Sequence, residues 1–427
     1  MSFTSDSRWS DVAVATGARA LSAGGDFLAA TALLLALQQR GAGSYAVAAL
    51  LLAAAVPPVV LVRWTGRLAD RLDSRMLLVI TGSAQAVACV AMVFVSNVFA
   101  LIALATLLGC GYAQTQPVLA ALLPAMVRRD DLPRASALGQ TATSVGMLLA
   151  PALGGVLVGQ FGLRVPLLFD AVSYLAIVAA GLFIRTRRQH GVAVNPVKDA
   201  TTDAGAAATS DTAVAGGRMR VPAWRLRDDH LVRTMLVLLG AVLAAVSAVN
   251  VADVFFVRGV LHSSTTMYGI LTAVWTGSSI LGAWVLTRRH LSDSGLGRMM
   301  VGALLLTCAA ILGVSAARSI APLVPLFVLG GAANGAVNVA ATVMLSRRTP
   351  AELRGRVFAV YAAVGNGAQA VGILAGGILL DVLPVRLTIA ATCGFGLIVT
   401  GVFAVPMLRQ ATRERAVPAR AAADLAA

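Results

Sequence analysis

The sequence is poor in charged residues and contains almost no lysine. Charged side chains make up 12% of the 427 residues, whereas soluble domains carry roughly a quarter. The single lysine, Lys198, lies in Val-Lys-Asp, so the chain has no Gly-x-x-x-x-Gly-Lys-[Ser/Thr] loop to bind the phosphates of a nucleotide. Hydrolysis of ATP by this chain is therefore excluded.

Histidine and cysteine are also scarce, with four of each. Every histidine lies in or beside an expected loop, which leaves no buried base for an intramembrane hydrolase. The cysteines all fall inside apolar runs without CxxC or metal-ligand spacing, which is typical of buried free thiols. We expect neither an enzyme, nor a metal site, nor a cofactor.

Apolar residues are what the chain has in abundance, at 58%. A soluble protein of this length could not bury so much apolar surface, so the lipid bilayer is the expected solvent and lipid the expected partner. The net charge of +15 is spread over short loops, and aromatic residues reach only 5%. We do not expect nucleic acid as a partner.

Twelve stretches are long and apolar enough to be transmembrane helices, each of about 20 residues. The predicted spans are 12–37, 45–63, 76–95, 98–125, 137–160, 165–184, 231–257, 266–287, 299–316, 320–345, 357–380 and 386–407. The predicted fold class is therefore all-α and integral to the membrane, and we expect a monomer.

Basic residues are concentrated in alternate loops, in the long central segment and near both ends of the chain. The opposite loops hold only Arg40, Arg164, Arg258, Arg318 and Arg386. By the positive-inside rule, both termini are predicted to lie in the cytoplasm of a multi-pass protein of the cytoplasmic membrane.

The central segment divides the spans into two sets of six. Residues 199–217 are mostly Thr, Ala, Gly and Asp without an apolar period, as in a flexible linker. Each set carries a basic turn followed by a helix with a Gly-Gly pair, at Gly154-Gly155 and Gly376-Gly377. We predict two pseudo-symmetric halves around a central cavity, 1–188 and 228–408, with a linker at 189–227 and a cytoplasmic tail at 409–427.

The turn between the second and third spans reads Gly66-Arg67-Leu68-Ala69-Asp70-Arg71-Leu72-Asp73-Ser74-Arg75. It resembles the cytoplasmic signature between spans two and three of the major facilitator superfamily of secondary transporters. The family pattern has Gly where this chain has Asp73. The resemblance implies a conformational lock made by Gly66, Asp70, Arg71 and Arg75, in which the acid engages the neighbouring helices in one state and releases them in another.

The fifth span contains Gly146-Met-Leu-Leu-Ala150-Pro151-Ala-Leu-Gly154-Gly155. It resembles the Gly-x-x-x-Gly-Pro-x-x-Gly-Gly pattern of exporters and antiporters in that superfamily, with Ala150 in place of one Gly. Pro151 removes a backbone hydrogen bond, and the small residues Gly146, Gly154 and Gly155 permit close packing. With the first and sixth spans, these residues resemble the group that contains macrolide efflux proteins and the enterobactin exporter.

Ionisable groups within spans are costly and therefore functional candidates. Of the 19 acids, only Asp26, Asp170 and Asp253 lie within predicted spans. Asp26, near mid-membrane, is the first candidate to carry a coupling proton, and Asp170 the second; a structural ion-pair network is the alternative. Arg19 lies about 10 Å along the helix from Asp26, so it is expected to meet Asp170 or a substrate anion instead. Asp253, near Arg258, is expected to be structural.

Uncharged polar residues within spans either line a cavity or bond between helices. Gln114 and Asn338 are the favoured cavity candidates. The full set of such residues is Gln114, Gln116, Asn250, Asn334, Asn338, Asn366 and Gln369.

These features predict a secondary transporter that exports small amphipathic compounds, namely drugs, siderophores or metabolites, by proton antiport with alternating access. The alternative is a proton-coupled importer of a small nutrient on the same fold. Export is favoured because few charges are buried and the motifs are of the exporter type.

Overall fold

The computed structural model describes residues 7–61, 64–65, 68, 72–184, 229–288, 292–349 and 353–424. Within these ranges, eleven helices are long and apolar enough to cross a membrane, and α2 is a shorter apolar helix of 17 residues. Together they account for the twelve predicted spans, so the prediction of an all-helical membrane fold is confirmed.

The first half of the chain forms six of these helices, and a short 3-10 turn, η1 (Arg129–Asp131), leads into the fifth. The six helices are α1 (Trp9–Gln39), α2 (Ser44–Val60), α4 (Ser74–Phe94), α5 (Val98–Met126), α6 (Leu132–Phe161) and α7 (Arg164–Phe183).

The second half forms the other six helices, the first of which ends in a π-helical turn, η2 (Phe255–Val260). The six helices are α9 (His230–Val254), α10 (Thr265–Thr287), α11 (Asp293–Ala316), α12 (Leu323–Arg348), α13 (Arg354–Val382) and α14 (Val385–Asp424).

Polar residues at the helix starts satisfy free backbone N–H groups and set several boundaries. The side chain of Asn97 accepts from Phe99 N at 2.8 Å, and Ser264 accepts from Met267 N at 3.1 Å. Ser292 likewise caps α11, which therefore begins at Asp293, six residues before the predicted apolar span. Helix α14 also continues beyond its apolar part to Asp424, through the stretch predicted as a tail.

The two halves repeat the same set of helix contacts. In the first half α1 packs on α6 and α7, and α4 packs on α5 and α7; in the second half α9 packs on α13 and α14, and α11 packs on α12 and α14. The halves meet through two equivalent pairs, α2 with α13 and α6 with α10. This pairing gives the fold its approximate two-fold symmetry.

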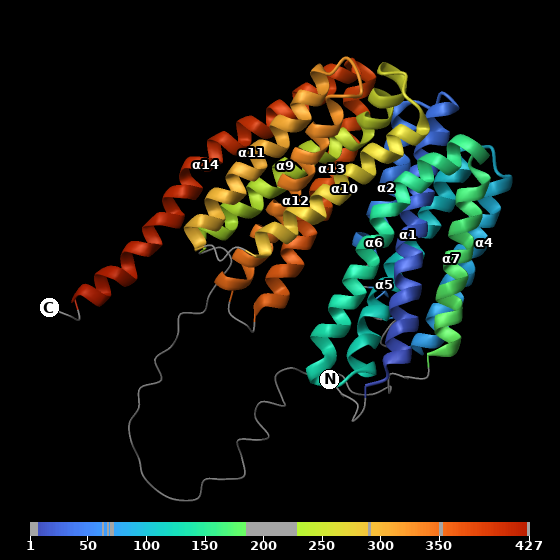
Figure 1. The fold of residues 1–427 in the computed structure, drawn as a ribbon, viewed down its shortest axis with the longest axis horizontal. Helices are drawn as coiled ribbons and strands as arrows, with labels where there is room; N and C mark the ends of the chain where they lie inside the picture. The colour runs from blue at the N-terminus through green and yellow to red at the C-terminus, as the bar shows by residue number, and fades with distance from the viewer. Residues whose placement is uncertain are drawn as a thin grey trace, which may run out of the picture.

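The halves touch at one end and separate toward the other (Figure 1). At the joined end, which holds the turns after α1 and α9, Tyr45 donates to Asp381 at 3.4 Å across the α2–α13 contact. The start of α1, the end of α7 and the start of α9 lie at the separated end (Figure 1). The helices of the two halves therefore diverge toward the end at which α7 ends and α9 begins (Figure 1).

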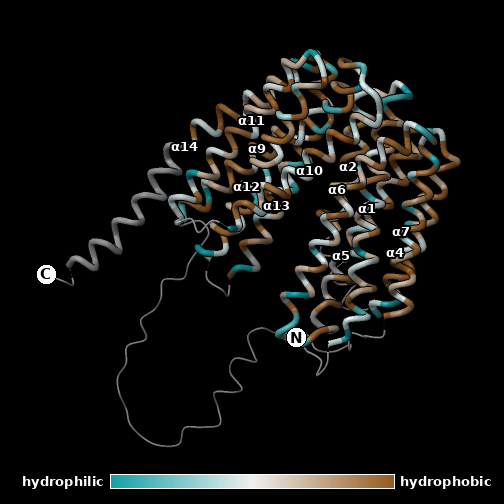
Figure 2. Tube along the Cα trace, in the orientation of Figure 1, coloured by the Kyte–Doolittle hydropathy of each residue, from teal (hydrophilic) through white to brown (hydrophobic). Residues whose placement is uncertain are grey.

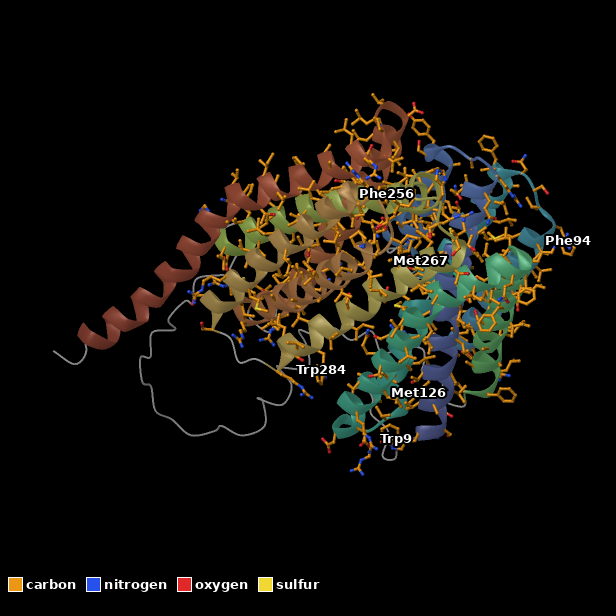
Figure 3. All side chains as sticks on the ribbon, turned by 45° about the horizontal axis from the view of Figure 1, so that its top comes forward. Trp9, Phe94, Met126, Phe256, Met267 and Trp284 are labelled. Carbon is orange, nitrogen blue, oxygen red and sulfur yellow. The ribbon has the colours of Figure 1, made fainter. Side chains whose placement is uncertain are left out.

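The helices are largely apolar along their length, and hydrophilic residues gather near the helix ends (Figure 2). Phe94 and Phe99 are 81% and 83% exposed, as expected for side chains that face lipid. Trp9 and Trp284 lie toward the separated end (Figure 3), where Arg134 and Arg288 stack on their rings at 5.2 Å and 3.6 Å. Such tryptophan and arginine pairs are typical of the membrane–water interface.

Candidate functional site

A cavity of about 410 Å³ lies between the halves and is lined mainly by the first half. Helices α1, α2, α5, α6 and α7 supply most of its wall, and Asn250, Gln369 and Ile373 close it from the second half. The lining is mostly Ala and Leu. Its polar groups are Asp26, Tyr112, Asp170, Tyr174, Asn250 and Gln369.

Asp26 lies past the middle of α1, and its side chain is partly exposed to this cavity. One carboxylate oxygen, Oδ1, accepts a hydrogen bond from the hydroxyl of Tyr174 on α7. The other, Oδ2, is buried and has no hydrogen-bond partner among the described residues. Asp26 therefore lies at the cavity wall with one carboxylate oxygen hydrogen-bonded and the other buried without a partner among the described residues.

Asp170, on α7, is fully buried behind Asp26. Its Oδ1 accepts from Ser173 Oγ at 3.0 Å, and its Oδ2 accepts from Cys89 Sγ on α4 at 3.3 Å. The space for this carboxylate depends on Gly25, because a Cβ atom there would collide with Asp170 Oδ1 and Ser173 Oγ. Both carboxylates thus lie where α1 meets α7, with Asp170 against the backbone of Gly25 and Asp26 at the hydroxyl of Tyr174.

The two carboxylates interact electrostatically with each other. Within the described part of the chain, neither forms an ion pair with a basic side chain. A buried carboxylate without a counter-charge is costly in a low-dielectric setting, and two such groups close together raise that cost. The simplest ion that can neutralise either of them is a proton, so the arrangement is suited to binding and releasing one.

Arg19 does not contact Asp170, which corrects one of its two expected pairings. Its side chain is half-buried, and its Nε has no hydrogen-bond partner among the described residues. Tyr112 lies within electrostatic reach of both Arg19 and Asp26. The arginine therefore lies near the acid pair without neutralising it, and the pairing with a substrate anion stays a prediction.

The small residues of α6 face two different helices. Toward α1, a Cβ atom at Gly146 would lie 2.7 Å from Ala20 O, and one at Gly154 would lie 3.2 Å from Leu28 O. Toward α10, a Cβ atom at Gly155 would lie 2.5 Å from Thr265 O. The exporter-type motif is thus the place where α6 joins its own half to the other half.

Pro151 takes part in the same contact, since its carbonyl oxygen approaches Gly269 of α10 so closely that a Cβ atom there would collide with it. A proline in a helix leaves one carbonyl without its usual backbone donor. The α6–α10 contact therefore brings backbone against backbone, with glycine on both sides.

Most of the turn between α2 and α4 cannot be assigned, because Gly66, Asp70 and Arg71 lie outside the described residues. Arg75 is exposed in the first turn of α4. Asp73, which stands where the family pattern has Gly, is the N-cap of α4 and accepts from Arg75 N at 2.9 Å. The departure from the family pattern thus provides a helix cap.

Among the uncharged polar candidates, Asn250 and Gln369 line the main cavity. A separate cavity of about 260 Å³ in the second half is lined by Asn334, Asn338, Asn366 and Gln369. Asn338 Nδ2 donates to the backbone oxygen of Asn334 at 3.0 Å. Gln114 is buried, with an unpartnered Nε2, and lines none of these cavities. The side chain of Gln116 lies outside the described part.

Sequence reasoning missed three members of the acid cluster, namely Tyr174, Ser173 and Cys89. The first two could have been found, because they follow Asp170 by four and three residues and so share its helix face. Cys89 was predicted to be a buried free thiol, which it is. Its contact with Asp170 joins residues 81 positions apart and has no signal in the sequence.

Comparison with known proteins agrees with this architecture. The family model described as Major Facilitator Superfamily matches residues 15–291 and 261–425. The uncharacterized MFS-type transporter YfiS of Bacillus subtilis (strain 168) is 24% identical over 382 residues, which cover 88% of each chain. Multidrug resistance protein MdtG of Dickeya zeae (strain Ech586) is 27% identical over 312 residues, which cover 70% of each chain.

Solved structures share the fold at low sequence identity. The nucleoside transporter NupG has a TM-score of 0.67 at 14% identity, covering 91% of this chain and 98% of its own. A bacterial homolog of the human lysosomal transporter Spinster, in an inward-facing and unoccupied conformation, has a TM-score of 0.67 at 13% identity, covering 94% and 98%.

Proposed function

The chain belongs to the Major Facilitator Superfamily, and we propose that it is a proton-coupled exporter of small amphipathic compounds such as drugs, siderophores or metabolites. It acts as a monomer in the cytoplasmic membrane, with both termini in the cytoplasm. In this orientation the separated end of the two halves faces the cytoplasm, as in an inward-facing state (Figure 1).

The observation that carries the proposal is the acid pair at the cavity wall. Asp26 lies at the cavity wall with one buried, unpartnered carboxylate oxygen, and Asp170 lies close to it without a basic partner among the described residues. A proton on Asp26 removes a charge from an apolar surface, and its loss restores that charge. Proton occupancy therefore changes the polarity of the substrate cavity itself.

The chemistry of the cavity favours an amphipathic substrate over a polar nutrient. Its wall is formed largely by Ala and Leu side chains of α1, α2 and α5, and only a few polar groups face it. Apolar walls with a small number of placed polar groups bind ligands mainly through apolar contact. The likeness to MdtG, a multidrug resistance protein, supports export.

Alternating access requires the joined end to open. Two helix contacts hold it closed, α2 with α13 and α6 with α10. In the second of these, glycines meet backbone atoms with no side chains between them. Such a contact can separate as a unit, because no side chain has to be withdrawn from a pocket.

Transport into everted membrane vesicles with an acidic lumen tests the proposal. We expect accumulation of a fluorescent amphipathic substrate that a protonophore abolishes. Asp26→Asn should lose the dependence on the proton gradient, whereas Asp130→Asn, at an exposed acid of the loop before α6, should retain it. Undiminished proton-driven transport by Asp26→Asn would exclude Asp26 as the coupling group. Accumulation only in right-side-out vesicles with an acidic exterior would instead identify an importer.

A further inference from the structure

A third cavity, of about 240 Å³, contains the third acid of the spans, Asp253. This residue lies in the last turn of α9, directly before the π-helical turn η2. The cavity lies between the halves, because Phe27, Thr31 and Leu51 of the first half line it together with helices of the second. Asp253 therefore lines a cavity between the halves, whereas the sequence suggested a structural role.

Asp253 has no hydrogen bond or ion pair with any described residue. Arg258, the basic residue close to it in sequence, does not line this cavity and donates to the backbone oxygen of Ser263 instead. Tyr268 and Cys393 lie within electrostatic reach of the carboxylate, but neither carries a positive charge. No Arg, Lys or His is among the cavity-lining residues. The carboxylate has no counter-ion in the part of the protein that the structure describes.

Aromatic side chains surround the same cavity. Tyr268, Trp275 and Phe327 line it from the second half, and Phe27 lines it from the first. The Trp275 and Phe327 rings meet edge to face, with centroids 5.8 Å apart at 77°. Ser278 holds their helices together, since its hydroxyl contacts the backbone oxygens of Trp275 at 3.0 Å and Phe327 at 3.2 Å. Aromatic faces beside an unpaired carboxylate are the groups that bind an organic cation.

This cavity adjoins the larger one at the acid pair. The two share five lining residues, Phe27, Ala30, Leu34, Leu51 and Asn250. Four of the five are apolar, so an apolar body can extend from the aromatic cavity into the larger one without meeting a charged group on the shared wall. A molecule with a cationic head and an apolar body matches the two cavities together.

We propose that Asp253 is the binding site for the positively charged amine of the substrate, which makes the cargo an amphipathic organic cation. This inference rests on the proposed function, because it names the cargo class of that exporter. It also assigns different functions to the two halves. Asp253 in the second half binds the cation, whereas Asp26 and Asp170 in the first half bind and release the proton.

Equilibrium binding to the purified full-length protein in lipid nanodiscs tests this assignment. The probes are (naphthylmethyl)trimethylammonium, whose charge is fixed, and its neutral carbon isostere neopentylnaphthalene. The wild type should bind the cation more tightly than the isostere. Asp253→Asn should weaken binding of the cation by about tenfold or more and leave the isostere unaffected, which also shows that the variant is folded.

Two further variants make the test specific. Asp253→Glu keeps the charge and should retain the preference for the cation, and Asp130→Asn, at an exposed acid that lines none of the described cavities, should retain it as well. Equal binding of both probes by the wild type would overturn the assignment, as would undiminished binding of the cation by Asp253→Asn. Intact cation selectivity without proton-driven efflux would contradict the proposed exporter and leave the binding site standing.

Discussion

Tyr174 of α7 donates a hydrogen bond to Asp26 of α1, and this contact joins two helices whose residues lie 148 positions apart. Tyr174 is 1% exposed, so its hydroxyl has no access to bulk water. The same turn of α7 carries Asp170 and Ser173, which form the second acid site. One short stretch of α7 therefore organises both carboxylates.

Tyr174→Phe should slow proton-driven transport by about tenfold, because both oxygens of Asp26 would then lack a fixed donor. The loss of one buried hydrogen bond should lower the free energy of unfolding by only about 1 kcal/mol. Vesicle transport and thermal unfolding measure the two effects. Tyr361→Phe, at a tyrosine that lines the cavity of the second half, is the matched control and should change neither. Wild-type transport by Tyr174→Phe would remove this hydrogen bond from the mechanism.

Gly25→Ala should destabilise the protein and disturb the acid cluster together. The new methyl group would collide with Asp170 Oδ1 and Ser173 Oγ, and overpacking of this kind costs about 1–3 kcal/mol. We expect a lower melting temperature and weaker proton-driven transport. Gly17→Ala in the same helix, where no atom lies within 4 Å of the new methyl group, should leave both unchanged. Equal behaviour of the two variants would contradict the tight packing at Gly25.

Gly155→Ala should shift the protein away from the conformation described here. Its methyl group would press on Thr265 O and Gly269 of α10, and a cost of about 1–3 kcal/mol changes the ratio of two states by roughly 5- to 150-fold. Spin labels at positions 45 and 381, across the α2–α13 contact, should report a larger population at long distance. Gly302→Ala, with open space around it, is the control. An unchanged distance distribution would mean that the α6–α10 contact does not hold this end closed.

The two acids of the turn before α4 should have different effects. Asp73→Ala removes the N-cap of α4 and should cost about 0.5–2 kcal/mol of stability, whereas Asp73→Asn keeps a capping oxygen and should cost little. Asp70→Ala should slow turnover more than it weakens substrate binding, as expected for a residue that acts as a conformational lock. Transport kinetics and a binding isotherm separate the two quantities, and weaker binding with an unchanged transport step would contradict the lock.

The positions of the twelve spans could be predicted because the apolar runs are long and are separated by polar turns. The observed helix ends differ most from the predicted span ends where a polar segment extends the helix, as it does from Asp293 in α11. The acids Asp26, Asp170 and Asp253 could be identified one by one, since a charge within an apolar run is visible without a structure. The contacts of Tyr174 with Asp26 and of Cys89 with Asp170 could not be predicted, because each of them joins two different helices.

The surroundings of Asp253 could not be predicted from the sequence either, because its neighbour in the sequence is not its partner in the structure. In the sequence it lies close to Arg258, which suggests an ion pair near the end of a span. The π-helical turn from Phe255 to Val260 changes the direction of the side chains after Asp253, and Arg258 bonds to the following loop instead. An inserted residue of this kind leaves no periodic signal in a uniformly apolar helix.

The glycines of α6 have almost no freedom to change, since Gly146 and Gly154 fit against α1 while Gly155 fits against α10. A larger residue at Gly146 or Gly154 disturbs the contact with α1, and a larger residue at Gly155 disturbs the contact with α10. Mutations at these glycines therefore act on the whole transport cycle. The Ala and Leu side chains of α1 and α2 that line the cavities carry no such double constraint. A directed-evolution library that aims to change the cargo should therefore vary those lining positions and keep α6 fixed.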